Sequence, residues 1–352
     1  MTETVSVKLR DWYQVHKRDL PWRESSDPYV IWISEIILQQ TRVAQGLSYF
    51  LRFAERFPDI RSLAEAEEDD VLKYWQGLGY YSRVRNMHTT AQLIMNKFGG
   101  IFPEQYEDIL SLKGVGEYTA AAITSFVWNK PYPVVDGNVF RVLSRLYGID
   151  TPIDSGKGKR EFYELAGAIM DKQYAGIHNQ AMMEFGALQC IPQNPDCKGC
   201  VLKEQCVAYA SGTVSRLPVK KSGIKTRNRY FHYFHVTYEQ HTFLSKRGEK
   251  DIWAGLYEFP LIETDELMDF AELEQASGFR DLFEGCGNLN IKIQLPKVKH
   301  VLSHQVLYVS FYSVEIEKIG HRLQQYQMIP CEEIERYAVS RLMHIYINRS
   351  SE

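Results

Sequence analysis

The stretch Leu112-Lys113-Gly114-Val115-Gly116-Glu117-Tyr118-Thr119-Ala120 decides how the first half of this chain is organised. Two glycines flank a valine, and the alanine-rich segment behind them is expected to be helical. Gly114 and Gly116 leave backbone N–H groups free at the positive end of that helix, which suits an anion such as a phosphate. Further along the chain, Asp136 opens the sequence Asp136-Gly137-Asn138-Val139. We therefore expect an anion-binding corner with an acidic residue near it.

The totals describe a globular chain. A length of 352 residues favours two domains, and 45% hydrophobic with 24% charged residues is enough apolar content for each to bury a core. No apolar run reaches the length that spans a membrane, and the N-terminus lacks the apolar core of a signal peptide, so a cytoplasmic protein is expected. The net charge of −3 gives no signal for nucleic acid, but such binding depends on a local basic face.

Residues 1–206 show no convincing strand alternation, and we expect them to form an all-helical domain. Within it, Leu20-Pro21-Trp22-Arg23 interrupts the first helix because proline is a poor residue inside a helix. Trp22 and Arg23 together offer an aromatic plane and a bidentate donor. A turn that places Trp22 in a core for packing alone is the alternative, and the sequence leaves both open.

A nearly all-apolar helix at residues 30–41 contains one carboxylate, Glu35. A glutamate in such a helix is usually solvated, and the flanking isoleucines do not exclude an exposed stripe. A half-buried Glu35 would instead have a raised pKa and hold a proton near neutral pH. Periodicity does not decide between the two readings.

A second glycine turn, Gly77-Leu78-Gly79-Tyr80-Tyr81, is followed by Arg83 and Arg85 on the next expected helix. Aromatic residues beside arginines at a tight turn suit a wedge into nucleic acid. A packed turn between helices with surface arginines is an equal alternative.

The character of the chain changes after Cys206. Residues 207–228 are expected to be a basic linker, because no acidic residue occurs from Thr213 to Arg229. Residues 229–352 are expected to form a mixed α and β domain. Aromatic and β-branched stretches at 230–238 and 305–314 predict strands, the second of them central because both of its faces are apolar, and 265–274 predicts a helix.

Four of the six cysteines fall in one short loop, at residues 190–206. Their spacing is C-x6-C-x2-C-x5-C, from Cys190, Cys197, Cys200 and Cys206. Clustering in a cytoplasmic chain favours a metal over disulfides. Structural zinc usually shows two close pairs, whereas four thiolates in one loop suit a [4Fe–4S] cluster, although the spacing differs from the ferredoxin patterns. The spacing does not exclude zinc. The loop either has a purely structural role or presents positive charge through its lysines.

Taken together, the Gly-Val-Gly hairpin, Asp136 and the cysteine loop resemble the helix-hairpin-helix DNA glycosylases of the endonuclease III superfamily. Within it, residues 8–206 resemble the adenine glycosylases (the MutY family), and residues 229–352 resemble the MutT-like domain of that family. The stretches that carry the resemblance are Leu20-Pro21-Trp22-Arg23, Ser34-Glu35, Leu38-Gln39-Gln40-Thr41, Gly77-Leu78-Gly79-Tyr80-Tyr81, Asp136-Gly137-Asn138-Val139, Asn179-Gln180-Ala181-Met182-Met183, Ile252 to Pro260, and His300-Val301-Leu302-Ser303-His304.

This resemblance implies excision of adenine mispaired with 8-oxoguanine or guanine in duplex DNA, by a monomer that carries a [4Fe–4S] cluster on the four cysteines. Glu35 resembles the acid that protonates the adenine imidazole ring. Asp136, which also suits an N-cap, resembles the carboxylate that stabilises the sugar cation. Tyr118 and Asn138 resemble their supporting residues. Relatives with lyase activity carry a lysine where this chain has Tyr118, so a monofunctional enzyme is expected; Lys113, where the family often has proline, leaves a weak lyase activity conceivable.

The resemblance also assigns binding roles, since the base must leave the duplex to reach such a site. Gln40 and Tyr80 resemble residues that wedge into the base stack. Ser303 and His304 resemble residues that recognise 8-oxoguanine, although Leu302 replaces the phenylalanine that is common in the family. The MutT hydrolase signature is absent, so the second domain should recognise and not hydrolyse. Adenine-pocket residues are expected at Leu20, Trp22, Arg23 and Gln180, and phosphate contacts at Gly114 and Gly116.

Two rival functions fit the sequence less well. A thymine or oxidised-pyrimidine glycosylase is disfavoured by the second domain and by Tyr118. A catalytically silent DNA-binding module would use the hairpin and the cysteine loop, but it has no need for Glu35 and Asp136 together.

Overall fold

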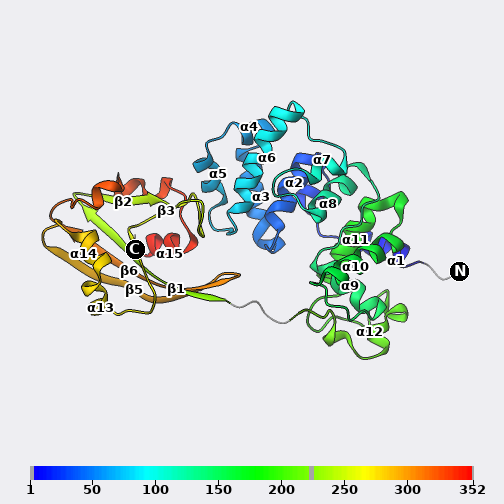
Figure 1. Ribbon diagram of the computed structural model, residues 1–352. Helices are drawn as coiled ribbons and strands as arrows, with labels where there is room; N and C mark the ends of the chain where they lie inside the picture. The colour runs from blue at the N-terminus through cyan, green and yellow to red at the C-terminus, as the bar shows by residue number, and fades with distance from the viewer. Residues whose placement is uncertain (1–3, 222–225, 351–352) are drawn as a thin grey trace. The chain divides into compact units, whose positions relative to one another are not determined.

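The computed structural model describes residues 4–221 and 226–350 (Figure 1). Contacts divide the chain into two compact units. The first comprises Met1–Glu65 and Asn86–Ser222, and the second comprises Ala66–Arg85 and Gly223–Glu352. The grouping of residues 66–85 with the C-terminal part of the chain was not expected from the sequence.

The first unit is helical, as the sequence predicts, and no strand occurs among the described residues before Arg227. Helix α5 (Glu68–Trp75) belongs to the second unit, and α6 (Ser82–Phe98) begins there and continues into the first. None of the helices in the described ranges is long and apolar enough to cross a membrane. The other helices of the first unit are α1 (Val5–His16), α2 (Pro28–Leu38), α3 (Val43–Arg56), α4 (Ile60–Ala64), α7 (Tyr106–Leu110), α8 (Glu117–Trp128), α9 (Gly137–Tyr147), α10 (Gly156–Ile169), α11 (Ala175–Leu188) and α12 (Val207–Ala210).

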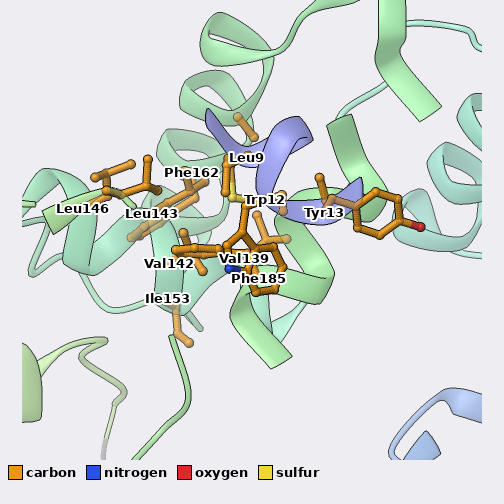
Figure 2. Close-up of a cluster of buried hydrophobic side chains, with 14 residues drawn as sticks. Leu9, Trp12, Tyr13, Val139, Val142, Leu143, Leu146, Ile153, Phe162 and Phe185 are labelled. Atoms are coloured by element: carbon orange, nitrogen blue, oxygen red, sulfur yellow. The ribbon is translucent and has the colours of Figure 1, made fainter. Parts of the chain in front are cut away.

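One core of this unit packs α1, α9 and α11 together (Figure 2). Apolar residues at helical spacing supply it, for example Leu9 and Trp12 on α1 and Val139 and Leu143 on α9. Trp12 meets Phe185 of α11 edge to face, with 5.0 Å between ring centroids. Each fully buried large apolar side chain contributes about 1.5–3 kcal/mol, so the core fixes α9 firmly. The core therefore also fixes the first turn of α9, which carries polar residues.

The structure corrects the prediction that residues 207–228 are a linker, because part of this segment is folded. Helix α12 and a 3-10 turn at Val214–Arg216 lie within it. Ala208 is fully buried, and the carbonyl of Leu217 accepts a hydrogen bond from Arg145 Nε at 3.1 Å. Small and apolar residues among the basic ones therefore pack onto the first unit. Residues 222–225, with the expected linker residue Lys225, lie outside the described residues.

The second unit contains a mixed sheet with the strand order β3-β2-β1-β6-β5, and β4 and β7 pair with β1 and β2. Strands β1 and β6 run parallel, and β6 lies between β1 and β5, so the prediction of a central strand is confirmed (Figure 1). Helix α15 (Arg341–Ser350) packs on one face, and α13 (Phe270–Gln275) and α14 (Ser277–Phe283) pack on the other. The strands are β1 (Arg227–Tyr238), β2 (His241–Lys246), β3 (Tyr257–Glu258), β4 (Leu261–Thr264), β5 (Leu289–Val301), β6 (Gln305–Ile316) and β7 (Gln327–Pro330).

Two histidines of β1 predict acid sensitivity of the second unit. Burial lowers the pKa of His232 and of His235 to about 4. The unfolded chain binds these protons near pH 6.5 and the folded chain only near pH 4, so stability should fall as the pH is lowered through this window, by up to about 3 kcal/mol for each histidine. Urea unfolding at pH 7.5 and 5 should show a smaller pH effect in H232Q/H235Q than in the wild type. His321→Gln, at an exposed position, is the control; an equal pH effect in the double variant would contradict the assignment.

Candidate active site

A cavity of about 600 Å³ lies in the first unit, and side chains from distant parts of the sequence line it. It is bordered by the turn at Pro21–Arg23 and by α2, α8, α9 and α11. Eight residues expected at a site are among those that line it: Leu20, Trp22, Arg23, Glu35, Tyr118, Asp136, Asn138 and Gln180.

Glu35 is buried, which decides between the two readings of its helix. Only 6% of the residue is exposed. The buried residues of α2 lie on every side of the helix, so no exposed stripe remains at Glu35. The Tyr118 hydroxyl donates to Glu35 Oε2 at 2.6 Å. Burial raises the pKa of Glu35 to about 7, although Tyr118 acts in the opposite direction. A large fraction of Glu35 therefore holds a proton at neutral pH.

Asp136 is the N-cap of α9, and both of its oxygens accept hydrogen bonds. The Val139 N–H donates to Oδ1 and Asn138 Nδ2 donates to Oδ2, each at 2.7 Å. Burial raises the pKa of Asp136, while these two donors lower it. Burial outweighs the donors, so the pKa of Asp136 is raised, and the two hydrogen bonds limit that rise because they favour the charged form.

Arg141, which the sequence did not single out, holds Asn138 in place. Its Nη2 donates to Asn138 Oδ1 at 2.9 Å and to the Gly186 carbonyl at 2.6 Å, and its Nε donates to the Cys190 carbonyl at 2.7 Å. The position of Arg141 one turn after Asn138 on α9 is the local signal that was available. Its distant partners were not visible in the sequence.

Both interpretations of Trp22 hold. The residue is 6% exposed and packs edge to face on Phe50, and it also lines the cavity. Gln180 accepts a hydrogen bond at Oε1 from the Tyr13 hydroxyl at 2.6 Å. Arg23 pairs with Glu184, a buried carboxylate of α11 that the sequence did not single out. Glu184 is thus an additional residue of the cavity wall, and Tyr13 holds Gln180 through its hydrogen bond.

The two expected wedge residues are not part of this cavity. Gln40 is exposed just after α2, in a left-handed conformation with φ of 58°. Tyr80 belongs to the second unit, is 46% exposed and has φ of 49°. Tyr81 is 5% exposed and bonds to the Val339 carbonyl, so the turn presents one tyrosine and packs the other.

The second unit has its own cavity of about 460 Å³, which Tyr80, Ser303 and His304 help to line. The Tyr80 hydroxyl and Ser303 Oγ lie 3.0 Å apart. Trp253 also lines it, again with a left-handed backbone, φ 58°. This cavity brings the expected recognition residues together with one expected wedge residue.

The glycine hairpin has the expected geometry. Gly114 has φ of 80°, and a Cβ there would lie 2.7 Å from the Cβ of Asn86, so glycine is required. Gly116 is the exposed N-cap of α8, whose first N–H groups carry no side-chain cap. The corner can accept an anion.

The four clustered cysteines are half-buried and line one small cavity of about 30 Å³. Arg145 Nη1 donates to Cys190 Sγ at 3.5 Å, and the Leu202 N–H donates to Cys200 Sγ at 3.4 Å. In the part of the chain that the structure describes, no three His, Cys, Asp or Glu side chains are placed to hold a metal ion. The all-sulfur donor set around one cavity is chemically suited to an iron–sulfur cluster.

The chain is similar to known proteins in both sequence and structure. Residues 33–167 match the HhH-GPD superfamily base excision DNA repair proteins, and residues 232–349 match the NUDIX domain. The adenine DNA glycosylase of Buchnera aphidicola (Acyrthosiphon pisum) is 38% identical over 76% of this chain and 77% of that protein. The adenine DNA glycosylase of Arabidopsis thaliana is 32% identical over 90% of this chain and 58% of that protein.

Two solved structures resemble the helical part. A thermostable thymine-DNA glycosylase matches with 27% identity over 58% of this chain and 95% of its own, with a TM-score of 0.53. An endonuclease III in a non-covalent complex with DNA matches with 21% identity over 59% of this chain and 96% of its own, with a TM-score of 0.51, which supports the fold alone.

Proposed function

Because this chain belongs to the adenine DNA glycosylases, which hydrolyse N-glycosyl bonds in base excision repair, we propose that it excises adenine paired with 8-oxoguanine or guanine in duplex DNA. One observation carries the proposal: two carboxyl groups, Glu35 with its pKa raised to about 7 and Asp136, line one cavity, and each is held by its own hydrogen-bonding partner. The enzyme acts as a monomer in the cytoplasm, on DNA of the nucleoid.

In this mechanism Glu35 donates its proton to the adenine imidazole ring, which makes the base a better leaving group. Tyr118 orients Glu35 through the 2.6 Å hydrogen bond. As the bond to the sugar breaks, positive charge develops on the sugar, and the Asp136 carboxylate stabilises it. Asn138 keeps Asp136 oriented. Water completes the hydrolysis, and Tyr118 cannot form the imine that a lyase requires, so the enzyme is monofunctional.

The remaining predicted residues have DNA-binding roles in this proposal. The hairpin N–H groups at Gly114 and Gly116 bind a phosphate and set the register without reading sequence. Gln40 and Tyr80 enter the base stack. Ser303 and His304, in the cavity of the second unit, recognise the base opposite adenine. Leu20, Trp22, Arg23 and Gln180 enclose the extruded adenine.

A single-turnover assay tests the proposal with duplexes that contain A:8-oxoG, A:G or T:G. We expect adenine release from the first two and no thymine release from the third. The rate should fall as the pH rises through about 7, because the pKa of Glu35 is raised to about 7 and Glu35 acts in its protonated form. Thymine release would favour a pyrimidine glycosylase, and binding of all three duplexes without release would favour a DNA-binding module.

A [4Fe–4S] cluster is the proposed cofactor, held by Cys190, Cys197, Cys200 and Cys206, where it fixes the fold of the loop. The purified protein should be yellow-brown and contain iron. In Cys200→Ser most of the visible absorbance should be lost, and the unfolding midpoint should fall by roughly 5–10 °C. Cys331→Ser, outside the loop, is the control. A colourless wild-type protein that contains zinc would overturn this assignment.

A further inference from the structure

Glu184 is a carboxylate of α11 that accepts five hydrogen bonds from two arginines. Its side chain is 1% exposed. Arg18 donates from its backbone N–H and from Nε, each at 2.9 Å, and from Nη2 at 2.6 Å. Arg23 donates from Nη1 at 2.9 Å and from Nη2. All three residues line the 600 Å³ cavity.

The charge of Glu184 is fixed by these contacts. Burial alone would raise its pKa, but the hydrogen bonds from Arg18 and Arg23 outweigh burial and hold the pKa at about 2. Glu184 is therefore ionised at any pH at which the enzyme works, and it cannot donate a proton in catalysis. A buried ion pair that loses one partner leaves an uncompensated charge, which is strongly unfavourable.

Arg23 is held at three points on the wall of the cavity. Besides Glu184, its Nη1 donates to the Arg18 carbonyl at 2.8 Å, and its guanidinium lies 5.6 Å from the ring centroid of Tyr13. Within the described residues Arg23 forms no ion pair with Glu35. The ionisable groups that act on Glu35 are Tyr118 of α8, Asp136 at the start of α9 and Arg23, so Arg23 is the cation among them.

We infer that Glu184 is a positioning residue that anchors Arg18 and Arg23 in the cavity wall and keeps a free guanidinium away from Glu35. The inference rests on the proposed role of Glu35 as the acid. Arg23 already opposes the burial that raises the pKa of Glu35. Loss of the Glu184 charge leaves the cavity more positive and frees Arg23 to approach Glu35. Both changes favour the ionised form of Glu35, which cannot protonate adenine.

The test is the pH dependence of single-turnover adenine release from an A:8-oxoG duplex in Glu184→Gln. The pH midpoint on the alkaline side should move from about 7 to about 6, which lowers the rate at pH 7.5 roughly eightfold while the activity at low pH is largely kept. Glu184→Asp keeps the charge and should keep the wild-type midpoint, even where its rate is lower. A uniform loss at every pH in Glu184→Gln would indicate a structural role only and would overturn the inference.

Arg23→Leu tests the same idea without altering Glu184. Removal of the cation should move the midpoint above that of the wild type, and E184Q/R23L should not show the low midpoint of the single Glu184→Gln variant. A midpoint unchanged by Arg23→Leu would overturn the inference even if Glu184→Gln did not fold. Wild-type enzyme that releases no adenine from A:8-oxoG would refute the proposed function instead, so the two failures are distinguishable.

Discussion

Glu35→Gln should lower the rate of adenine release from an A:8-oxoG duplex by about 10²–10⁴-fold, the range that a general acid contributes. Glutamine keeps the size of the side chain and an oxygen that can accept the Tyr118 hydrogen bond, but it has no acidic proton. The residual rate should lose its fall above pH 7, because that fall reports the ionisation of Glu35. Single-turnover rates from pH 5.5 to 8.5 measure both effects.

The matched control for this variant is Glu164→Gln, which neutralises an exposed carboxylate of α10. It should retain the wild-type rate and pH dependence. Binding of DNA that carries a non-cleavable adenine analogue should change little in Glu35→Gln, since the acid acts on the leaving base. If this variant released adenine at the wild-type rate, another group would have to be the acid.

Asp136→Asn should lower the same rate by about 10²–10³-fold, the effect of removing one preorganised electrostatic group from a developing charge. The fold should persist, because asparagine is as good an N-cap as aspartate and can still accept from the Val139 N–H. The expected result is thus a large loss of rate with a change in unfolding free energy below about 1 kcal/mol. Thermal unfolding and single-turnover kinetics on one preparation test both parts.

Asp150→Asn provides the comparison for this second variant, because Asp150 is exposed shortly after α9. It should leave rate and stability unchanged. A loss of activity in Asp136→Asn that tracked a loss of folded protein would mean that Asp136 serves the helix alone. Activity retained in a folded Asp136→Asn protein would remove the carboxylate from the mechanism.

The sequence predicted the elements well where local chemistry specifies them. The nearly all-apolar run at residues 30–41 predicted α2, and Asp136 before Gly137 predicted the N-cap of α9. The central position of β6 was predicted because both of its faces are apolar. The linker was predicted from its basic, proline- and glycine-bearing composition, and that prediction missed Ala208 and Leu217, which are buried in the first unit.

The spacing of residues could not predict contacts between residues that are distant in the sequence. Glu184 lies in a mostly apolar helix, as Glu35 does, but its arginine partners are more than 160 residues away in the chain. The grouping of residues 66–85 with the second unit was also not predictable, because the local sequence pattern does not show which residues this segment contacts. Periodicity shows which residues share a face of a helix or strand, but it does not show which segments cover that face.

The sequence by itself determined the helical half, the mixed sheet, the glycine hairpin, the cysteine spacing and the residue types available for chemistry. Only the tertiary structure decided that Glu35, Tyr118 and Asp136 line one cavity and that Glu35 is buried with a pKa raised to about 7. The physical reason is that protonation depends on burial and on neighbouring charges, and folding alone brings those neighbours together.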